Sequence, residues 1–177
     1  EKCLRDSPWA NLRPPAPCLA RSNSFGPQVI QHISGNLKRA EGLDEVLVNA
    51  LLAALFSGSA IISLHVPLSD ETRDLINADV LSHAKQGLVL INAARGEVVD
   101  IDALHDAMKS GQIGGAGVDV LSEEPTNLER PLLAAWHNNE EWVRDRLLVT
   151  PHSAFYTPQS LFDMRTKGIT VALKYLR

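Results

Sequence analysis

The sequence predicts an α/β fold, an incomplete Rossmann-like, doubly wound parallel sheet in a single domain. Short apolar runs rich in β-branched residues alternate with segments of helical periodicity, which is typical of parallel sheets. Polar residues with chemical potential follow three of these runs directly, as at the carboxyl ends of strands in an open sheet. The composition is that of an ordinary globular chain, with 45% hydrophobic and 21% charged residues.

The first half of the regular pattern contains two expected strands around one expected helix. The first strand covers residues 29–33. Apolar residues at helical spacing then predict a helix over residues 43–55, and Ser57-Gly58 is a suitable stop. Residues 61–66 form a β-branched apolar run closed by Pro67, which predicts a buried parallel strand.

The second half continues the alternation. A short helix is expected over residues 77–83 with Asn77 as its cap, and a longer helix begins after Asp100 and runs to Ser110, with Gly111 as its stop. The remaining elements are three strands and a closing helix, expected over residues 88–92, 115–120, 147–150 and 158–176.

Two segments depart from this regularity. Five prolines interrupt residues 1–27, so we expect that segment to be irregular and the domain to cover residues 28–177. Residues 127–146 are long for a connection between strands and carry Trp136 and Trp142. We expect a surface excursion that packs these tryptophans on the domain, with an interface as the alternative.

Charge and composition argue against several classes of partner. The net charge is −4 without a basic block, which argues against a direct nucleic-acid partner. No apolar run is long enough to span a membrane. Cys3 and Cys18 have no neighbouring cluster with metal-ligand spacing, so we expect no metal site and a reducing, cytoplasmic setting.

Arg95, Glu124 and His152 each follow a different one of three successive expected strands. Taken singly, they are ordinary as a surface charge, a turn residue and a structural histidine. Together they form a clamp and an acid/base pair. Arginine binds a carboxylate bidentately, and a carboxylate beside an imidazole favours the protonated ring, which can donate to a carbonyl as hydride arrives at carbon. This set predicts hydride chemistry on a 2-keto or 2-hydroxy acid.

Several motifs in order carry a family resemblance. These motifs are Leu64-His65-Val66-Pro67-Leu68, Asn92-Ala93-Ala94-Arg95-Gly96, Gly117-Val118-Asp119-Val120 and Thr150-Pro151-His152. Through them, residues 59–177 resemble the NAD-binding domain of the D-isomer-specific 2-hydroxyacid dehydrogenases. The ending Pro151-His152-Ser153-Ala154-Phe155-Tyr156 resembles the subgroup around the C-terminal-binding proteins, which are NAD-binding corepressors.

The resemblance implies Arg95, Glu124 and His152 as the catalytic set and Asp119 as the acceptor for the nicotinamide carboxamide. It also implies NAD as the cofactor, with NADP left open, and a small 2-keto or 2-hydroxy acid as the substrate. The resemblance also implies a homodimer, and a nuclear location in place of the cytoplasm if the chain is corepressor-like. The residues that it places along the cofactor are Val66, Pro67, Leu68, Ala93, Ala94, Arg95, Asp119, His152 and Ser153.

The pattern fails near the start of the chain. Ala10, Leu12 and Pro15 stand where the three glycines of the phosphate-binding turn belong, so residues 1–27 are interpreted as a divergent remnant of the first strand and helix. Ile33 stands where an acidic residue would bind the ribose. We also expect the chain to lack the family's separate substrate domain. We therefore expect weak cofactor binding and negligible turnover, with a truncated product and a short paralogue both open.

The failed pattern leaves two rival hypotheses. One is a non-catalytic, corepressor-like module that senses NAD or binds proteins. The other is a fragment that does not fold stably alone, because missing elements leave apolar faces uncovered.

Overall fold

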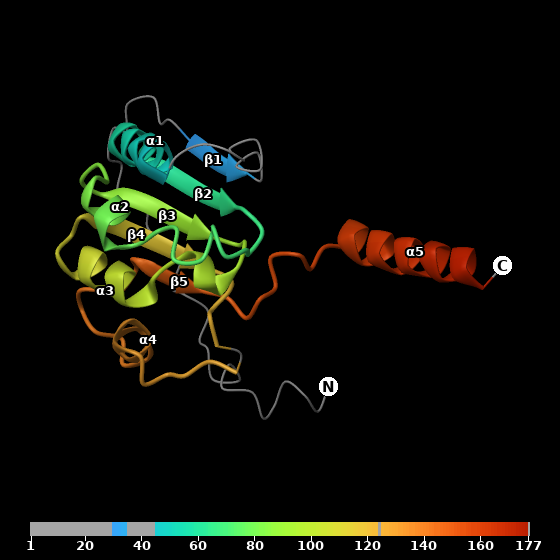
Figure 1. The fold of residues 1–177 in the computed structure, drawn as a ribbon. Coiled ribbons are helices and arrows are strands. Elements are labelled where there is room, and N and C mark those ends of the chain that lie inside the picture. Colours follow the sequence, from blue (N-terminus) through green and yellow to red (C-terminus); the bar gives the residue numbers. More distant parts are fainter. Residues whose placement is uncertain (1–29, 35–44, 124, 177) are drawn as a thin grey trace.

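The computed structural model describes residues 30–34, 45–123 and 125–176. Five strands form one parallel sheet whose spatial order follows chain order. The predicted Rossmann-like parallel α/β class is thereby confirmed, and the order of the described strands never reverses. The carboxyl ends of all five therefore lie along one edge (Figure 1). The strands are β1 (Ile30–Ser34), β2 (Ile61–His65), β3 (Leu88–Asn92), β4 (Ile113–Val118) and β5 (Leu147–Val149).

Four helices follow the first four strands. Each contacts the next, so together they form a row along the sheet, as expected when crossovers of constant hand always step in one direction (Figure 1). These helices are α1 (Glu45–Gly58), α2 (Ala78–Ser82), α3 (Ile101–Lys109) and α4 (Pro131–His137). A fifth helix, α5 (Pro158–Tyr175), extends away from the sheet. None of the helices in the described ranges is long and apolar enough to cross a bilayer.

Local signals in the sequence place the helix ends. Asn77 caps α2 by accepting the Val80 amide at 3.1 Å, and Asp100 caps α3 by accepting the Asp102 and Ala103 amides at 3.0 and 3.1 Å. Both predicted caps are confirmed. Gly111, the predicted stop, adopts a φ of 83°, a left-handed conformation that glycine tolerates without steric cost.

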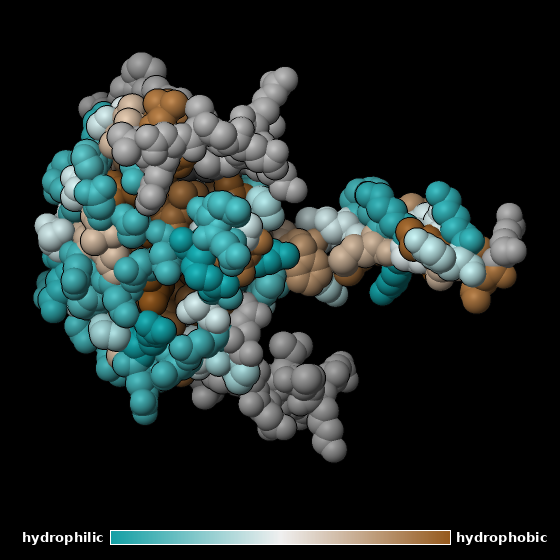
Figure 2. All heavy atoms as spheres, in the orientation of Figure 1, coloured by the Kyte–Doolittle hydropathy of each residue, from teal (hydrophilic) through white to brown (hydrophobic). Residues whose placement is uncertain are grey.

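The two faces of the sheet differ because side chains alternate along each strand. Ile62, Leu64 and Leu90 are at most 1% exposed and belong to the core. On the opposite face Ile91 and Leu148 are 37% and 56% exposed. The apolar side chains of α5 are also exposed, and Figure 2 shows hydrophobic patches along that helix.

Arg146 joins three segments at the amino-terminal side of the sheet. Its Nε donates to the carbonyl of Gly114 at 2.8 Å, and its Nη1 donates to that of Trp142 at 2.9 Å. Its Nη2 donates to the carbonyls of Met108 and Ile113 at 2.9 and 2.6 Å. One side chain therefore fixes the end of α3 against the start of β4 and the approach to β5.

One strand lies two residues earlier than predicted, at Ile113–Val118 in place of 115–120. It begins early because the left-handed turn at Gly111 ends α3 and leaves only Gln112 as a link. It ends early because the chain turns toward the loop after β5 at Asp119, whose carbonyl oxygen accepts the amide of His152 at 2.9 Å.

The other departures fall partly outside the described residues. Residues 1–27, with Cys3 and Cys18, lie there, and so does the expected domain boundary at residue 28. Within the expected excursion over 127–146, Trp136 and Trp142 are half-buried and pack against the hydrophobic core.

Candidate active site

Asn92 builds the turn that carries Arg95. It is the last residue of β3 and is 3% exposed, and both polar atoms of its side chain bond to the loop that follows it. Its Oδ1 accepts the amide of Ala94 at 3.1 Å, and its Nδ2 donates to the carbonyl of Arg95 at 2.9 Å. An asparagine that bonds to the backbone just ahead of it stabilises a tight turn, so Arg95 leaves the sheet in a fixed direction.

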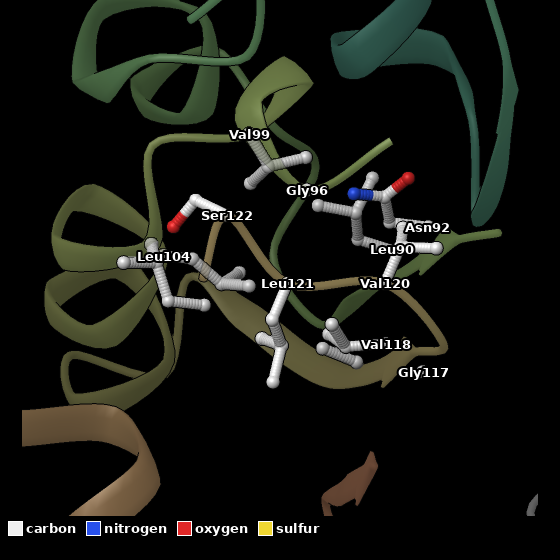
Figure 3. A pocket seen from close by; sticks show the side chains of 12 residues that line it. Leu90, Asn92, Gly96, Val99, Leu104, Gly117, Val118, Val120, Leu121 and Ser122 are labelled. Carbon is white, nitrogen blue, oxygen red and sulfur yellow. The ribbon is translucent and has the colours of Figure 1, made fainter. Parts of the chain in front are cut away.

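Gly96 lets this turn pack against the loop that follows β4. A Cβ on Gly96 would lie 2.1 Å from the carbonyl carbon of Leu121 and 2.3 Å from the amide nitrogen of Ser122. Figure 3 shows these three residues around a small cavity of about 10 Å³. A volume of about 10–15 Å³ is needed for a single water, so the cavity is an interior gap and not a ligand site.

Arg95 is exposed on this turn. Its Nη1 donates to the carbonyl of Ala94 at 2.6 Å, and within the described part of the chain it forms no ion pair. A guanidinium carries five N–H donors, so most of its hydrogen-bonding capacity is available to a ligand.

Asp119 follows β4 and is 8% exposed. Its Oδ1 accepts the hydroxyl of Thr150 at 2.5 Å and the amide of Ser153 at 2.8 Å, and its Oδ2 accepts the amide of Ala154 at 2.8 Å. Burial by itself would raise the pKa of Asp119. The three hydrogen bonds and the nearby charge of His152 outweigh burial, and the pKa lies below its ordinary value.

His152 lies in the same loop with a φ of 50°, in the left-handed region. That conformation costs a non-glycine residue about 1–2 kcal/mol, so other contacts must hold it. The amide of His152 donates to the carbonyls of Asp119 and Thr150 at 2.9 and 3.0 Å. Its ring packs edge-on against Phe155, with 6.3 Å between ring centroids. His152 is exposed.

The structure brings some of the predicted site residues together. A cavity of about 110 Å³ is lined by Asp119, Leu121, Pro125, Thr126, Thr150, Pro151 and His152. Arg95 does not line it and lies on the adjacent loop, which contacts the Leu121 backbone through Gly96. Glu124 lies outside the described residues, so its predicted place beside His152 stays a prediction.

The loop after β2 carries the residues predicted for the adenosine side. Val66 is 2% exposed, Leu68 is half-buried, and Pro67 is exposed. The hydroxyl of Thr72 donates to the carbonyl of Pro67 at 2.8 Å and also accepts the amide of Ser69 at 2.8 Å, which closes this loop on itself. Ala93 and Ala94 begin the next loop, at the end of β3. These predicted contacts thus occupy neighbouring strand ends.

Sequence reasoning missed the residues that organise these loops. Four such residues each fix a turn at a strand end and have no role in the predicted chemistry: Asn92, Gly96, Thr72 and Thr150. Asn92 and Thr72 gave a usable signal, a polar residue capable of backbone bonds beside a turn. Across residues 45–123 and 125–176, no three histidine, cysteine, aspartate or glutamate side chains gather as a metal site.

A parallel sheet with polar groups gathered at its carboxyl edge is typical of nucleotide-binding α/β domains. The family described as "D-isomer specific 2-hydroxyacid dehydrogenase, NAD binding domain" matches residues 18–154, which is more than half of the chain. The chain therefore belongs to this family.

Individual relatives agree with this assignment. D-3-phosphoglycerate dehydrogenase of Haemophilus influenzae is 36% identical over 148 residues, covering 81% of this chain and 31% of that protein. The structure of D-lactate dehydrogenase from Aquifex aeolicus with NAD and lactic acid is 31% identical, with a TM-score of 0.60, over 84% of this chain and 46% of that one. A D-isomer specific 2-hydroxyacid dehydrogenase from Xanthobacter autotrophicus Py2, with NADPH and MES, is 37% identical with a TM-score of 0.54, over 68% and 47%.

These relatives bear on the length of the chain, on its subgroup and on the cofactor. The chain spans about a third to a half of their length. Their names are those of dehydrogenases and do not single out the corepressor subgroup that the ending of the sequence resembles. The solved relatives include one complex with NAD and one with NADPH.

Proposed function

We propose that this chain is the cofactor-binding domain of an oxidoreductase that acts on the CH–OH group of 2-hydroxy acids, with NAD or NADP as the acceptor. The observation that carries the proposal is the buried Asp119, whose carboxylate accepts three hydrogen bonds from the loop that contains His152. This loop lies at the carboxyl edge of the parallel sheet in a chain that belongs to this family. The bound cofactor would accept or supply the hydride. The substrate class is a small 2-keto or 2-hydroxy acid, in keeping with the relative that was solved with lactic acid.

Arg95 and His152 have complementary roles in this proposal. Arg95 binds the substrate carboxylate through the donors that its bond to Ala94 leaves unused. His152 donates a proton to the carbonyl oxygen during reduction and accepts the hydroxyl proton during oxidation. Glu124 orients the ring and stabilises its protonated form.

The cofactor fits the edge formed by the ends of β2, β3, β4 and β5. Val66, Pro67 and Leu68 take the adenosine side, and Ala93 and Ala94 lie near the nicotinamide ribose. Arg95, His152 and Ser153 complete the cofactor side. An ionised carboxylate has about four acceptor positions, and the loop occupies three of those of Asp119. One acceptor position therefore remains for the nicotinamide carboxamide.

We expect the chain itself to bind the cofactor weakly. Ala10, Leu12 and Pro15 replace glycines whose amides would approach the pyrophosphate. Arg95 and His152 are also exposed, where water weakens each electrostatic contact. Titration calorimetry with NAD and NADP measures this directly, and a micromolar dissociation constant for either would contradict the expectation.

NADH oxidation at high protein concentration tests the reaction, with glyoxylate, hydroxypyruvate and phenylpyruvate as substrates. We expect turnover to be negligible at ordinary protein concentrations, and we expect the residual rate at high protein concentration to fall at least tenfold in His152→Ala and in Arg95→Ala. His137→Ala and Arg144→Ala are matched controls, because both residues are exposed and lie away from the loops after β3, β4 and β5. Equal rates in His152→Ala and the unmodified chain would refute the role of His152.

A second candidate is a non-catalytic module that senses NAD or binds proteins. The apolar side chains of α5 favour it, since Phe162, Ile169 and Leu173 are 64%, 62% and 51% exposed and available to a partner. NADH binding without any His152-dependent turnover would support this function over the first. A homodimer and a cytoplasmic location, or a nuclear one for a corepressor-like chain, belong to the same proposals, and sedimentation measures the oligomeric state.

A further inference from the structure

The loop after β5 lies at the surface. Pro151, His152, Ser153 and Ala154 are all exposed, so packing against the core does not hold this segment. The loop does contact Asp119, a buried side chain on the neighbouring strand end. The geometry of the loop must therefore come largely from hydrogen bonds.

Those bonds surround His152 on both sides. The Asp119 carboxylate accepts the Thr150 hydroxyl before His152 and the Ser153 and Ala154 amides after it, at 2.5, 2.8 and 2.8 Å. The Asp119 carbonyl accepts the amide of His152 itself at 2.9 Å. Two consecutive amides converging on one carboxylate form a nest, an arrangement that binds anions. Here the anion is part of the chain.

We propose that Asp119 is a positioning residue for His152: its carboxylate holds the loop in the left-handed turn that aims the imidazole, before any cofactor binds. This inference rests on the proposed function for the meaning of His152, and it adds a second role to Asp119. The carboxylate that offers its remaining acceptor position to the nicotinamide amide is the same group that sets the acid/base residue. Cofactor binding and placement of the imidazole are therefore coupled through one side chain.

Asp119→Asn tests the inference because it keeps the size of the side chain and exchanges one acceptor oxygen for an N–H donor. The new side-chain NH2 group can take the place of either oxygen. In one orientation it faces the Ala154 amide, and in the other it faces the Ser153 amide and the Thr150 hydroxyl. In both cases two donors face each other, so the nest cannot form. Asp100→Asn is the matched control. Asp100 also accepts two backbone amides, but it does so at the start of α3.

The first measurement is made on the full chain without cofactor. We expect hydrogen exchange at Ser153 and Ala154 to become at least tenfold faster in Asp119→Asn, and the ring resonances of His152 to move toward those of a histidine in an unstructured peptide. Asp100→Asn leaves these amides within about twofold. Unchanged exchange and unchanged ring resonances in Asp119→Asn would overturn the inference.

Thr150→Val supplies a second variant if Asp119→Asn does not fold. It removes one donor of nearly the same shape, and we expect an intermediate rise in exchange, about threefold. Exchange as slow as in the unmodified chain would again overturn the inference. These spectra do not depend on turnover. Suppose that Asp119→Asn speeds up exchange in the loop, but that NADH oxidation by the unmodified chain does not depend on His152. That result would refute the proposed function and leave the positioning role of Asp119 intact.

A kinetic readout separates positioning from a general loss of structure. In Asp119→Asn, kcat for NADH oxidation should fall at least tenfold while KM for the keto acid stays within about twofold, because no hydrogen bond or ion pair found among the described residues joins Arg95 to Asp119. Equal changes in kcat for Asp119→Asn and Asp100→Asn would contradict a positioning role.

Discussion

Gly96→Ala is the sharpest perturbation of the contact between the Arg95 turn and the loop after β4. The new Cβ would lie 2.1 Å from the carbonyl carbon of Leu121, whereas ordinary Cβ contacts lie at 3.4–4 Å. The two loops must therefore separate by about 1.3 Å to restore ordinary contact, the difference between 2.1 and 3.4 Å. The obstacle is backbone, which cannot rotate away as a side chain can.

The magnitude follows from the cost of overpacking. Inserting a methyl group into a well-packed site costs about 1–3 kcal/mol, and a clash with backbone belongs at the upper end, about 3 kcal/mol. For a chain of this size, that loss lowers the melting temperature by about 6–12 °C. A displacement of about 1 Å at a reacting group can lower catalysis a hundredfold, so NADH oxidation should fall further than stability explains.

Two other glycines provide matched controls. Gly114→Ala would place a Cβ 2.5 Å from the carbonyl oxygen of Gly87, a comparable clash at the opposite end of β4 from the site. Gly58→Ala meets nothing within 4 Å. We expect Gly114→Ala to lose stability without altering the site, and Gly58→Ala to be neutral or more stable by up to about 1 kcal/mol.

Urea unfolding followed by tryptophan fluorescence measures stability, and amide spectra report the site. Gly96→Ala should move the resonances of Arg95, Leu121 and Ser122, whereas Gly114→Ala should leave them in place. A Gly96→Ala variant as stable as Gly58→Ala, with unmoved resonances, would refute the close approach of the two loops.

Further predictions concern stability and pH. Arg146→Ala should cost about 3 kcal/mol, because four carbonyls lose charge-assisted hydrogen bonds and water replaces only part of them; Arg144→Ala, at an exposed site, should cost less than about 1 kcal/mol in the same urea experiment. Asp100→Ala should cost about 1 kcal/mol through loss of the α3 cap, and a cost near zero in thermal unfolding would contradict the capping role. Because the pKa of Asp119 is lowered, the stabilisation that its ionised carboxylate gives the loop is complete at pH values above the ordinary carboxyl pKa of about 3.9. This stabilisation is lost as the pH falls through the lowered pKa of Asp119. The loop amide resonances should therefore titrate below about pH 4, and a midpoint above it would contradict the direction of the shift.

The sequence could predict features whose cause is local. The strand over 88–92 and the caps Asn77 and Asp100 depend on residues within one turn, and each lies where it was expected. The parallel class followed from the alternation of such elements, which is also a local pattern.

Features that join distant segments could not be predicted in the same way. Gly96 is required because the backbone of Leu121 lies against it. The hydrogen bonds of Asp119 come from a loop that follows it by 31 to 35 residues. Nothing in a single sequence pairs these positions, because the contact exists only once the strands are aligned. The strand boundary at Val118 was misplaced for the same reason, since Asp119 turns toward that distant loop.

The central claim is that the carboxyl edge of the sheet binds a nicotinamide cofactor beside His152. Titration of the ¹⁵N-labelled chain with NADH, followed by amide chemical shifts, tests it most directly. We expect progressive chemical-shift changes at Ala93, Ala94, Asp119 and Ser153, with a dissociation constant for NADH that is weaker than micromolar. Shifts that leave these four residues unmoved while other parts of the sheet respond, or no shifts at all at high cofactor concentration, would contradict it.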